Sequence, residues 1–249
     1  MLFRSPLCDK LEAVVGEGAE GTCSLAISGN KIEGELSDNL IVKAYRMLSA
    51  DHILPHINFN LEKHIPSQAG LGGGSSDATY TLRLLNKLCQ LNLNSATLHQ
   101  YAVRLGADCA FFVTATPAFA TGIGDILEPM NAECAHLHGM YLLIVKPTVA
   151  ISTAQAFAFV KPQPTLIKCK DIVAQPVNSE WRNHLTNNFE VSAFKLHPEM
   201  HTIKEQLYNM GALYAQMSGS GSAFFGIFNT PPTLTANHFN GMFTYLCQL

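Results

Sequence analysis

A run of glycine and serine residues at 66–76 has the composition of a phosphate-binding loop. Its residues are Pro66, Ser67, Gln68, Ala69, Gly70, Leu71, Gly72, Gly73, Gly74, Ser75 and Ser76. Glycine adopts positive φ without strain and has no Cβ, so successive amide groups can converge on an anion close to the backbone. The pattern predicts an anion site, and with it an enzyme that uses a nucleotide.

The residues after this loop follow helical spacing. Apolar positions recur every three or four residues, at Ala78, Leu82, Leu85 and Leu88. A helix beginning here points the positive end of its dipole at the loop. We expect Ser75 and Ser76 to cap it, or to bind phosphate oxygens or a metal-bound water. The sequence allows two roles for Asp77, and it favours them about equally. Asp77 either faces Mg²⁺ or only stabilises the helix N-terminus.

The alternative to a phosphate loop is a flexible glycine turn before a helix. The segment differs from two common phosphate loops, because no Gly-Lys-Ser/Thr ends it and its glycine spacing is not that of a dinucleotide fingerprint. Its length, and the strand and helix expected on either side of it, favour the phosphate loop.

Composition narrows the class of protein. The chain has 249 residues, 47% of them hydrophobic, which suffices for one large domain or two small ones. A net charge of −3 without a basic block argues against nucleic acid as a partner. No apolar run is long enough to span a membrane. Seven cysteines lack CxxC or Cys/His ligand spacing, so we expect reduced thiols, a cytoplasmic protein and no metal held by side chains alone.

Strands and helices are expected to alternate along the chain. Strands are predicted over 7–15, 22–33, 56–63, 141–145, 213–217 and 223–228, with a strand pair over 118–128. Helices are predicted over 40–48, 95–105, 153–159, 180–194 and 198–210. The expected N-caps are Asp38 or Asn39 for the first, Ser95 for the second and Ser152 for the third. Residues 162–176 are expected to be irregular.

Two more segments suit a phosphate site. Asp108 lies in Gly106-Ala107-Asp108, between a helix end and an apolar run, where a carboxylate can be aimed rather than only solvated. From the residues alone, an Asp at a helix end or turn explains this position better. Residues 217–223, Met-Ser-Gly-Ser-Gly-Ser-Ala, predict a tight turn between two strands.

Together these segments resemble the GHMP kinases, the family of galactokinase, homoserine kinase and mevalonate kinase. Residues 66–78 resemble the second motif of the family, in the form Gly-Leu-Gly-Gly-Gly-Ser-Ser-Asp-Ala. Residues 106–112 and 118–125 resemble its catalytic-aspartate region, and residues 217–223 its third motif. Residues 185–190 resemble a family segment with Asn-Asp-Phe-Glu, in which this chain has Asn188 in place of Asp.

The resemblance implies an α+β, two-lobed GHMP kinase fold. Residues 1–138 would form a lobe like domain 2 of ribosomal protein S5, and residues 139–249 a ferredoxin-like lobe. ATP and Mg²⁺ are the implied cofactors, with residues 66–76 binding the nucleotide and Asp108 acting as the base for a substrate hydroxyl. Adenine is expected to bind near residues 39–42. The protein is expected to be a monomer or a homodimer.

The implied substrate is a small molecule, 4-diphosphocytidyl-2-C-methyl-D-erythritol. Its 2-hydroxyl would be phosphorylated, in a step of non-mevalonate isoprenoid biosynthesis. The triple glycine and Gly106-Ala107-Asp108 favour this substrate over those of other members, such as homoserine. A catalytically impaired ATP-binding homologue is a further alternative.

The start of the chain departs from the family pattern. Members carry a strand with Ala-Lys-Ile-Asn-Leu and a turn with Gly-Tyr-His, and neither is found here. Loss of one electrostatic group such as that lysine commonly costs about 10²–10³ in rate. We therefore expect an N-terminally incomplete kinase, whose activity an upstream extension would raise.

Overall fold

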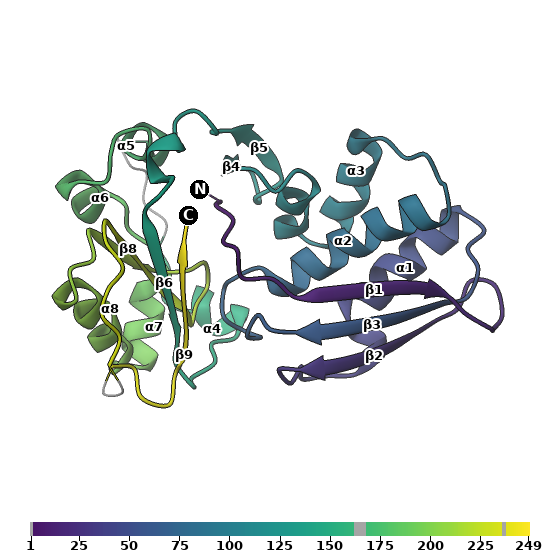
Figure 1. Ribbon diagram of the computed structural model, residues 1–249, viewed down its shortest axis with the longest axis horizontal. Coiled ribbons are helices and arrows are strands. Elements are labelled where there is room, and N and C mark those ends of the chain that lie inside the picture. The colour runs from purple at the N-terminus through teal and green to yellow at the C-terminus, as the bar shows by residue number, and fades with distance from the viewer. Residues whose placement is uncertain (1, 162–167, 236–237) are drawn as a thin grey trace. The chain divides into compact units, whose positions relative to one another are not determined.

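A computed structural model describes residues 2–161, 168–235 and 238–249 (Figure 1). The chain divides into two compact units. The N-terminal unit comprises Leu2–Ser67 and Gly72–Pro129, and the C-terminal unit comprises Gln68–Leu71 and Met130–Leu249. The sequence predicts a boundary between the two family domains after residue 138. The two compact units are defined by contacts within the chain and do not test that boundary, which stays a prediction.

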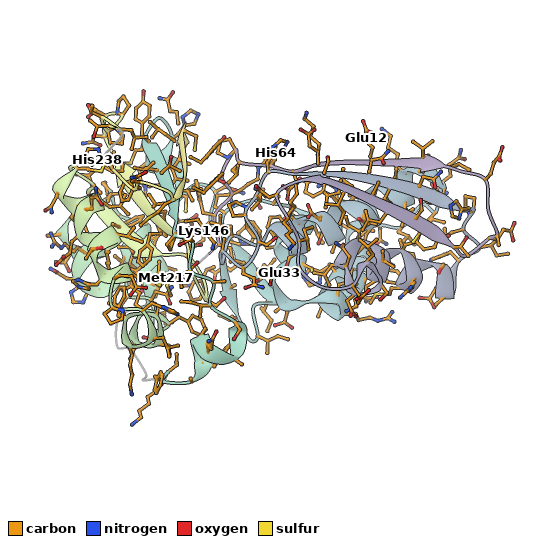
Figure 2. All side chains as sticks on the ribbon, turned by 90° about the horizontal axis from the view of Figure 1, so that it is seen from below. Glu12, Glu33, His64, Lys146, Met217 and His238 are labelled. Atoms are coloured by element: carbon orange, nitrogen blue, oxygen red, sulfur yellow. The ribbon has the colours of Figure 1, made fainter. Side chains whose placement is uncertain are left out.

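The N-terminal unit is built on a three-stranded sheet in the order β1-β3-β2. β3 is central, antiparallel to β1 and parallel to β2. Its alternation buries Ile57, Phe59 and Leu61 on the side where the helices pack, while Glu12 on β1 projects from the uncovered face (Figure 2). The bounds are β1 Lys10–Val15, β2 Cys23–Gly29 and β3 Ile57–Lys63, so all three predicted strands are confirmed, though the first two are shorter.

Helices cover one face of this sheet (Figure 1). Tyr45 and Leu48 of α1 and Leu82 and Leu85 of α2 are buried in a core with Phe59 of β3. The helices are η1 Leu36–Asp38, α1 Leu40–Asp51, α2 Gly73–Leu88, α3 Ser95–Leu105 and η2 Ala107–Val113, where η marks a 3-10 helix. The predicted strand pair over 118–128 is confirmed as an antiparallel hairpin, β4 Ala118–Thr121 with β5 Ile126–Pro129.

In the N-terminal unit, the helix caps confirm one prediction and correct two. Asn39 caps α1, because its side chain accepts a hydrogen bond from Ile41 N at 2.9 Å. Ser95 does not cap α3; Asn94 does, accepting from Thr97 N at 2.9 Å. Ser75 and Ser76 do not cap α2, which begins earlier, with Gly72 as N-cap in the left-handed conformation.

The C-terminal unit contains a four-stranded antiparallel sheet in the order β7-β8-β6-β9. Numbered along the chain, this is the 2-3-1-4 order of a ferredoxin-like sheet. The strands are β6 Tyr141–Lys146, β7 Tyr214–Met217, β8 Phe224–Phe228 and β9 Phe243–Gln248. The first three confirm predicted strands, whereas β9 was not predicted from the sequence.

Short helices accompany this sheet, and Met200, Leu207 and Phe224 lie in its apolar core. The helices are η3 Ala135–Leu137, α4 Thr153–Phe157, α5 Cys169–Val173, α6 Ser179–His184, α7 Glu190–Leu196 and α8 Met200–Asn209. Ser152 caps α4 in a capping box, as predicted. A single helix over 180–194 is wrong, since α6 and α7 are separate.

The irregular connection expected over 162–176 is also wrong in part, because it contains α5. Residues 162–167 of that connection lie outside the described residues. Within the described parts of the chain, no helix combines the length and apolar character needed to cross a membrane.

Candidate active site

The glycines of the predicted phosphate loop adopt conformations that suit an anion site. Gly70 has φ 68° and Gly72 has φ 70°, in the left-handed region that glycine enters without strain. Gly72 is the N-cap of the 16-residue helix α2, and no side-chain hydrogen bond caps that end. The first amide groups of α2 therefore keep their donors for a ligand, and the helix dipole favours an anion there.

Within the C-terminal unit, the turn at 217–223 packs against the first half of this loop. Ser218 Oγ donates to Gly70 O at 2.8 Å, and Ala223 N donates to Ala69 O at 3.0 Å. A Cβ added to Gly70 would overlap the carbonyl oxygen of Ser218. Glycine at 70 is thus required by both its φ and its close approach to the turn.

Two side chains of the 185–190 segment hold the same turn. Asn187 Nδ2 donates to Met217 O at 2.8 Å and to Gly219 O at 2.7 Å. Glu190 Oε1 accepts from Met217 N at 3.0 Å, and its other oxygen accepts from Lys204 Nζ at 2.7 Å. Met217 is buried inside the C-terminal unit (Figure 2). Residues 185–190 therefore hold the turn at 217–223, and this turn packs against residues 69 and 70 of the loop.

Asp108 lies in η2, which packs against the N-terminal half of α2. Thr79 Oγ1 of α2 donates to Cys109 O at 2.8 Å. The Phe112 ring lies 3.1 Å from the position that a Cβ on Gly72 would take. Within the N-terminal unit, η2, with Asp108, therefore packs against α2, whose first residues form the end of the phosphate loop.

The Asp108 carboxyl group is reachable from solvent, yet protein atoms around it remove part of its hydration. This desolvation raises the pKa of Asp108 above its ordinary value, which makes its carboxylate a stronger proton acceptor. No ion pair joins Asp108 to a lysine or arginine among the described residues.

Asp77 faces a lysine, a contact that neither interpretation of this residue included. Its carboxylate is buried, and Oδ2 accepts from Lys63 Nζ at 2.7 Å. Lys63 Nζ also donates to Asp9 Oδ2. Burial first, and then the neighbouring Asp9, raise the pKa of Asp77 to about 6, although Lys63 acts in the opposite direction. Asp77 is therefore an internal ion-pair partner in this structure.

Lys63 and Asp9 were not predicted from the sequence as members of the site. One signal was available for Lys63: it occupies the next buried position of β3 after Ile57, Phe59 and Leu61. A lysine at such a position is rarely buried unless it is paired. Asp9 precedes β1 and is 54 residues away from Lys63 along the chain, so no local pattern could reveal the contact.

The other predicted loop residues divide between the units. Pro66 and Ser67 belong to the N-terminal unit, as do residues 72–76, whereas Gln68–Leu71 belong to the C-terminal unit. Leu40, in the segment expected near adenine, lies 3.8 Å from a Cβ position on Gly74, while Ile41 and Val42 are buried. The adenine site and the roles of the individual loop residues stay predictions.

Residues 39–116 match the GHMP kinases N terminal domain, and residues 169–236 match the GHMP kinases C terminal domain. The 4-diphosphocytidyl-2-C-methyl-D-erythritol kinase of Bacteroides fragilis is 44% identical over 249 residues, which cover 100% of this chain and 89% of that protein. The chain belongs to the GHMP kinase family.

Two further relatives of this GHMP kinase agree with that placement. The 4-diphosphocytidyl-2-C-methyl-D-erythritol kinase of Bacteroides thetaiotaomicron is 47% identical over 226 residues, covering 91% of this chain and 81% of that protein. A crystal structure of a 4-(cytidine 5'-diphospho)-2C-methyl-D-erythritol kinase superposes with a TM-score of 0.68 at 28% identity, covering 90% of this chain and 78% of that one. The α+β GHMP fold predicted from the sequence is confirmed.

The one departure of this GHMP kinase at residues 185–190 has a simple structural reading. Asn188 is exposed, while its neighbours Asn187 and Glu190 make the hydrogen bonds that hold the turn at 217–223. Asn in place of Asp at 188 therefore leaves those contacts intact.

Proposed function

We propose that this GHMP kinase transfers the γ-phosphoryl group of ATP to the 2-hydroxyl of 4-diphosphocytidyl-2-C-methyl-D-erythritol, in non-mevalonate isoprenoid biosynthesis. The observation that carries the proposal is the loop at 66–76, in which Gly70 and Gly72 adopt positive φ before a helix whose N-terminus has no side-chain cap. Relatives 44% and 47% identical to this chain bear the name of the kinase for this substrate, which supports the choice of acceptor.

The loop fits the phosphates of ATP. Its glycines leave the backbone open, and the first amide groups of α2 point their donors to the side where an anion gains most from the helix dipole. Ser75 and Ser76 lie in the first helical residues and add hydroxyl donors. When bound, ATP supplies the phosphoryl group, and Mg²⁺ neutralises charge on the phosphates.

No group of three or more His, Cys, Asp or Glu side chains that could hold a metal ion exists among the described residues. Asp77, the acidic residue next to the loop, is bound to Lys63. The metal in this proposal is therefore held largely by the phosphates that it accompanies.

Asp108 is the proposed base. Its carboxylate accepts the proton of the 2-hydroxyl as the oxygen attacks, and the desolvation that raises its pKa favours this role. In the free protein, the described residues provide no cation paired with Asp108. The seven cysteines are free thiols, which fits the reducing cytoplasm where we place this enzyme.

The test is a direct assay with purified protein, Mg²⁺, ATP and the cytidyl substrate. Phosphorus NMR should show a new phosphate monoester on the 2-hydroxyl, in amounts equal to the ADP formed. Homoserine, offered in place of the cytidyl substrate, should give no product. ATP binding without product would favour an impaired homologue instead, and phosphorylated homoserine would favour another GHMP activity.

A further inference from the structure

A buried lysine lies between two carboxylates where the phosphate loop joins the N-terminal unit. Lys63 Nζ is 2.5 Å from Asp9 Oδ2 and 2.7 Å from Asp77 Oδ2, and at most 8% of any of the three side chains is exposed. Isolated charges are costly to bury, so a group of this kind persists only when each charge is paired.

The three residues come from three different parts of the unit. Asp9 precedes β1, Lys63 is the last residue of β3, and Asp77 lies in the second turn of α2. β3 is the strand that leads into the phosphate loop, and α2 is the helix that leaves it. Lys63 therefore links the entry of the loop to its exit through one ammonium group.

Asp9 extends this link to the backbone at the loop entry. Its Oδ1 accepts hydrogen bonds from His64 N at 2.6 Å and from Ile65 N at 2.8 Å. These are the two residues between the end of β3 and Pro66. One carboxylate thus fixes both the lysine and the direction in which the chain enters the loop.

Lys63 also lies close to the exit. A Cβ on Gly73 would be 3.0 Å from Lys63 Nζ and 2.9 Å from Ile65 Cγ2, so the first helical residue after the loop rests directly on this group. The amide of Gly73 is one of the donors that an anion at the start of α2 would meet. A shift of Lys63 would move these donors.

We infer that Lys63 is a positioning residue for ATP: by holding Asp9 and Asp77 together, it fixes the strand before the phosphate loop against the helix after it. Lys63 does not act as a free cation toward phosphate, because two carboxylates already share its charge. The inference rests on the proposed function, since it concerns the same nucleotide site.

The competing explanation is that Lys63 only neutralises two buried carboxylates. Three variants separate the two. Lys63→Met removes the link and leaves both charges unpaired. The double variant Lys63→Met/Asp77→Asn removes the link but also removes one charge, and Asp9 keeps its two backbone donors. Lys10→Met is the matched control, since Lys10 pairs with Glu62 at the surface of the same sheet.

Calorimetric titration with ATP–Mg²⁺ and steady-state kinetics then test the inference, after thermal melts have shown which variants are folded. We expect the folded double variant to bind ATP at least about tenfold more weakly, because small displacements of binding groups are costly. Its KM for the alcohol substrate should stay unchanged, and Lys10→Met should match the wild type in both.

A folded double variant that binds ATP as tightly as the wild type would overturn the inference and leave the proposed function standing. An equal rise in the KM values for ATP and for the alcohol would also overturn it, because it would indicate general loosening. If Lys63→Met does not fold, the double variant alone carries the test. Failure of the wild type to bind ATP would instead refute the proposed function, and the inference with it.

Discussion

Asp108 combines a raised pKa with a position next to the helix that follows the phosphate loop. Thr79 Oγ1 fixes the backbone of the neighbouring Cys109, so the carboxylate is carried by an anchored element although the side chain itself reaches solvent. This arrangement suits proton transfer to a carboxylate whose hydration is already reduced.

Replacing Asp108 should therefore reduce chemistry and spare nucleotide binding. We expect Asp108→Asn to lower kcat by about 10²–10⁴, the usual contribution of a general base. The Kd for ATP should not change, because the loop and α2 keep their contacts. Asp125→Asn is the control, since Asp125 accepts a hydrogen bond from Ile123 N within the neighbouring hairpin. A kcat for Asp108→Asn equal to that of Asp125→Asn would contradict the assignment.

Asp77 predicts a specific dependence of stability on pH. Because burial raises its pKa to about 6 from 3.8, the folded state retains a proton that the unfolded chain releases at lower pH. The contribution of this residue to the free energy of unfolding is complete below about pH 4 and is lost as the pH rises through about 6. Asn does not titrate, so Asp77→Asn should flatten this fall.

Urea denaturation of the wild type and of Asp77→Asn at several pH values between 4 and 7 measures the effect. The difference between the two free energies of unfolding should change over that interval. Asp38→Asn serves as the control, because Asp38 pairs with Lys43 at the surface. Curves for the wild type and Asp77→Asn that run parallel would show that Asp77 titrates normally.

At the scale of the elements, the phosphate loop requires glycine at position 70. Gly70 and Gly21 have nearly the same φ, 68° and 73°, but only Gly70 meets other atoms at its Cβ position. Alanine at either position should cost about 1–2 kcal/mol of backbone strain. Gly70→Ala should cost more, and should also weaken ATP binding, because it pushes the loop away from Ser218.

Comparing the two glycine variants isolates the effect of close packing from that of backbone strain. Chemical denaturation and ATP titration of both proteins provide the measurement. Equal stability losses, with ATP affinity intact in Gly70→Ala, would mean that the loop tolerates a side chain at that contact.

The turn at 217–223 depends on Asn187 in the same unit. Asn187→Ala removes hydrogen bonds to two carbonyl groups and should lower the free energy of unfolding by about 1–3 kcal/mol. Its exposed neighbour provides the control, and Asn188→Ala should stay within about 0.5 kcal/mol of the wild type. Urea denaturation of both variants measures this, and a larger loss in Asn188→Ala would contradict the described contacts.

Elements with a regular apolar pattern could be predicted from the sequence. The alternation of Ile57, Phe59 and Leu61 identified β3, and the N-cap candidates Asp38 and Asn39 identified the start of α1, which Asn39 caps. Local patterns failed where a distant contact decides. The helix expected over 180–194 is broken around Asn187, whose side chain bonds to the 217–223 turn about 30 residues away.

The same distinction applies to the candidate site. Its glycines were visible as a short motif of adjacent residues. Asp108 was predicted to belong to the site only from the resemblance of residues 106–112 to the family's catalytic-aspartate region, because the residues alone favour an Asp at a helix end or turn. The Asp9–Lys63–Asp77 group was not predicted, because its members meet only when a strand, a helix and a preceding segment pack together. The start of α2 was missed by a few residues, since it depends on the left-handed conformation of Gly72.

For the molecule as a whole, each unit has its own apolar core and its own set of contacts to part of the loop. Tyr45, Phe59 and Leu82 are buried in the N-terminal unit, and Met200, Leu207 and Phe224 in the C-terminal unit. The B. fragilis relative matches all 249 residues, which places both units within the GHMP kinase family.

The central claim is that this chain phosphorylates 4-diphosphocytidyl-2-C-methyl-D-erythritol on its 2-hydroxyl. The most direct test incubates the protein with ATP, Mg²⁺ and that substrate, and follows the product by phosphorus NMR beside the Asp108→Asn variant. We predict one new 2-phosphate monoester for each ADP formed by the wild type, and a rate lower by about 10²–10⁴ in the variant. ATP binding without any phosphorylated product would contradict the claim.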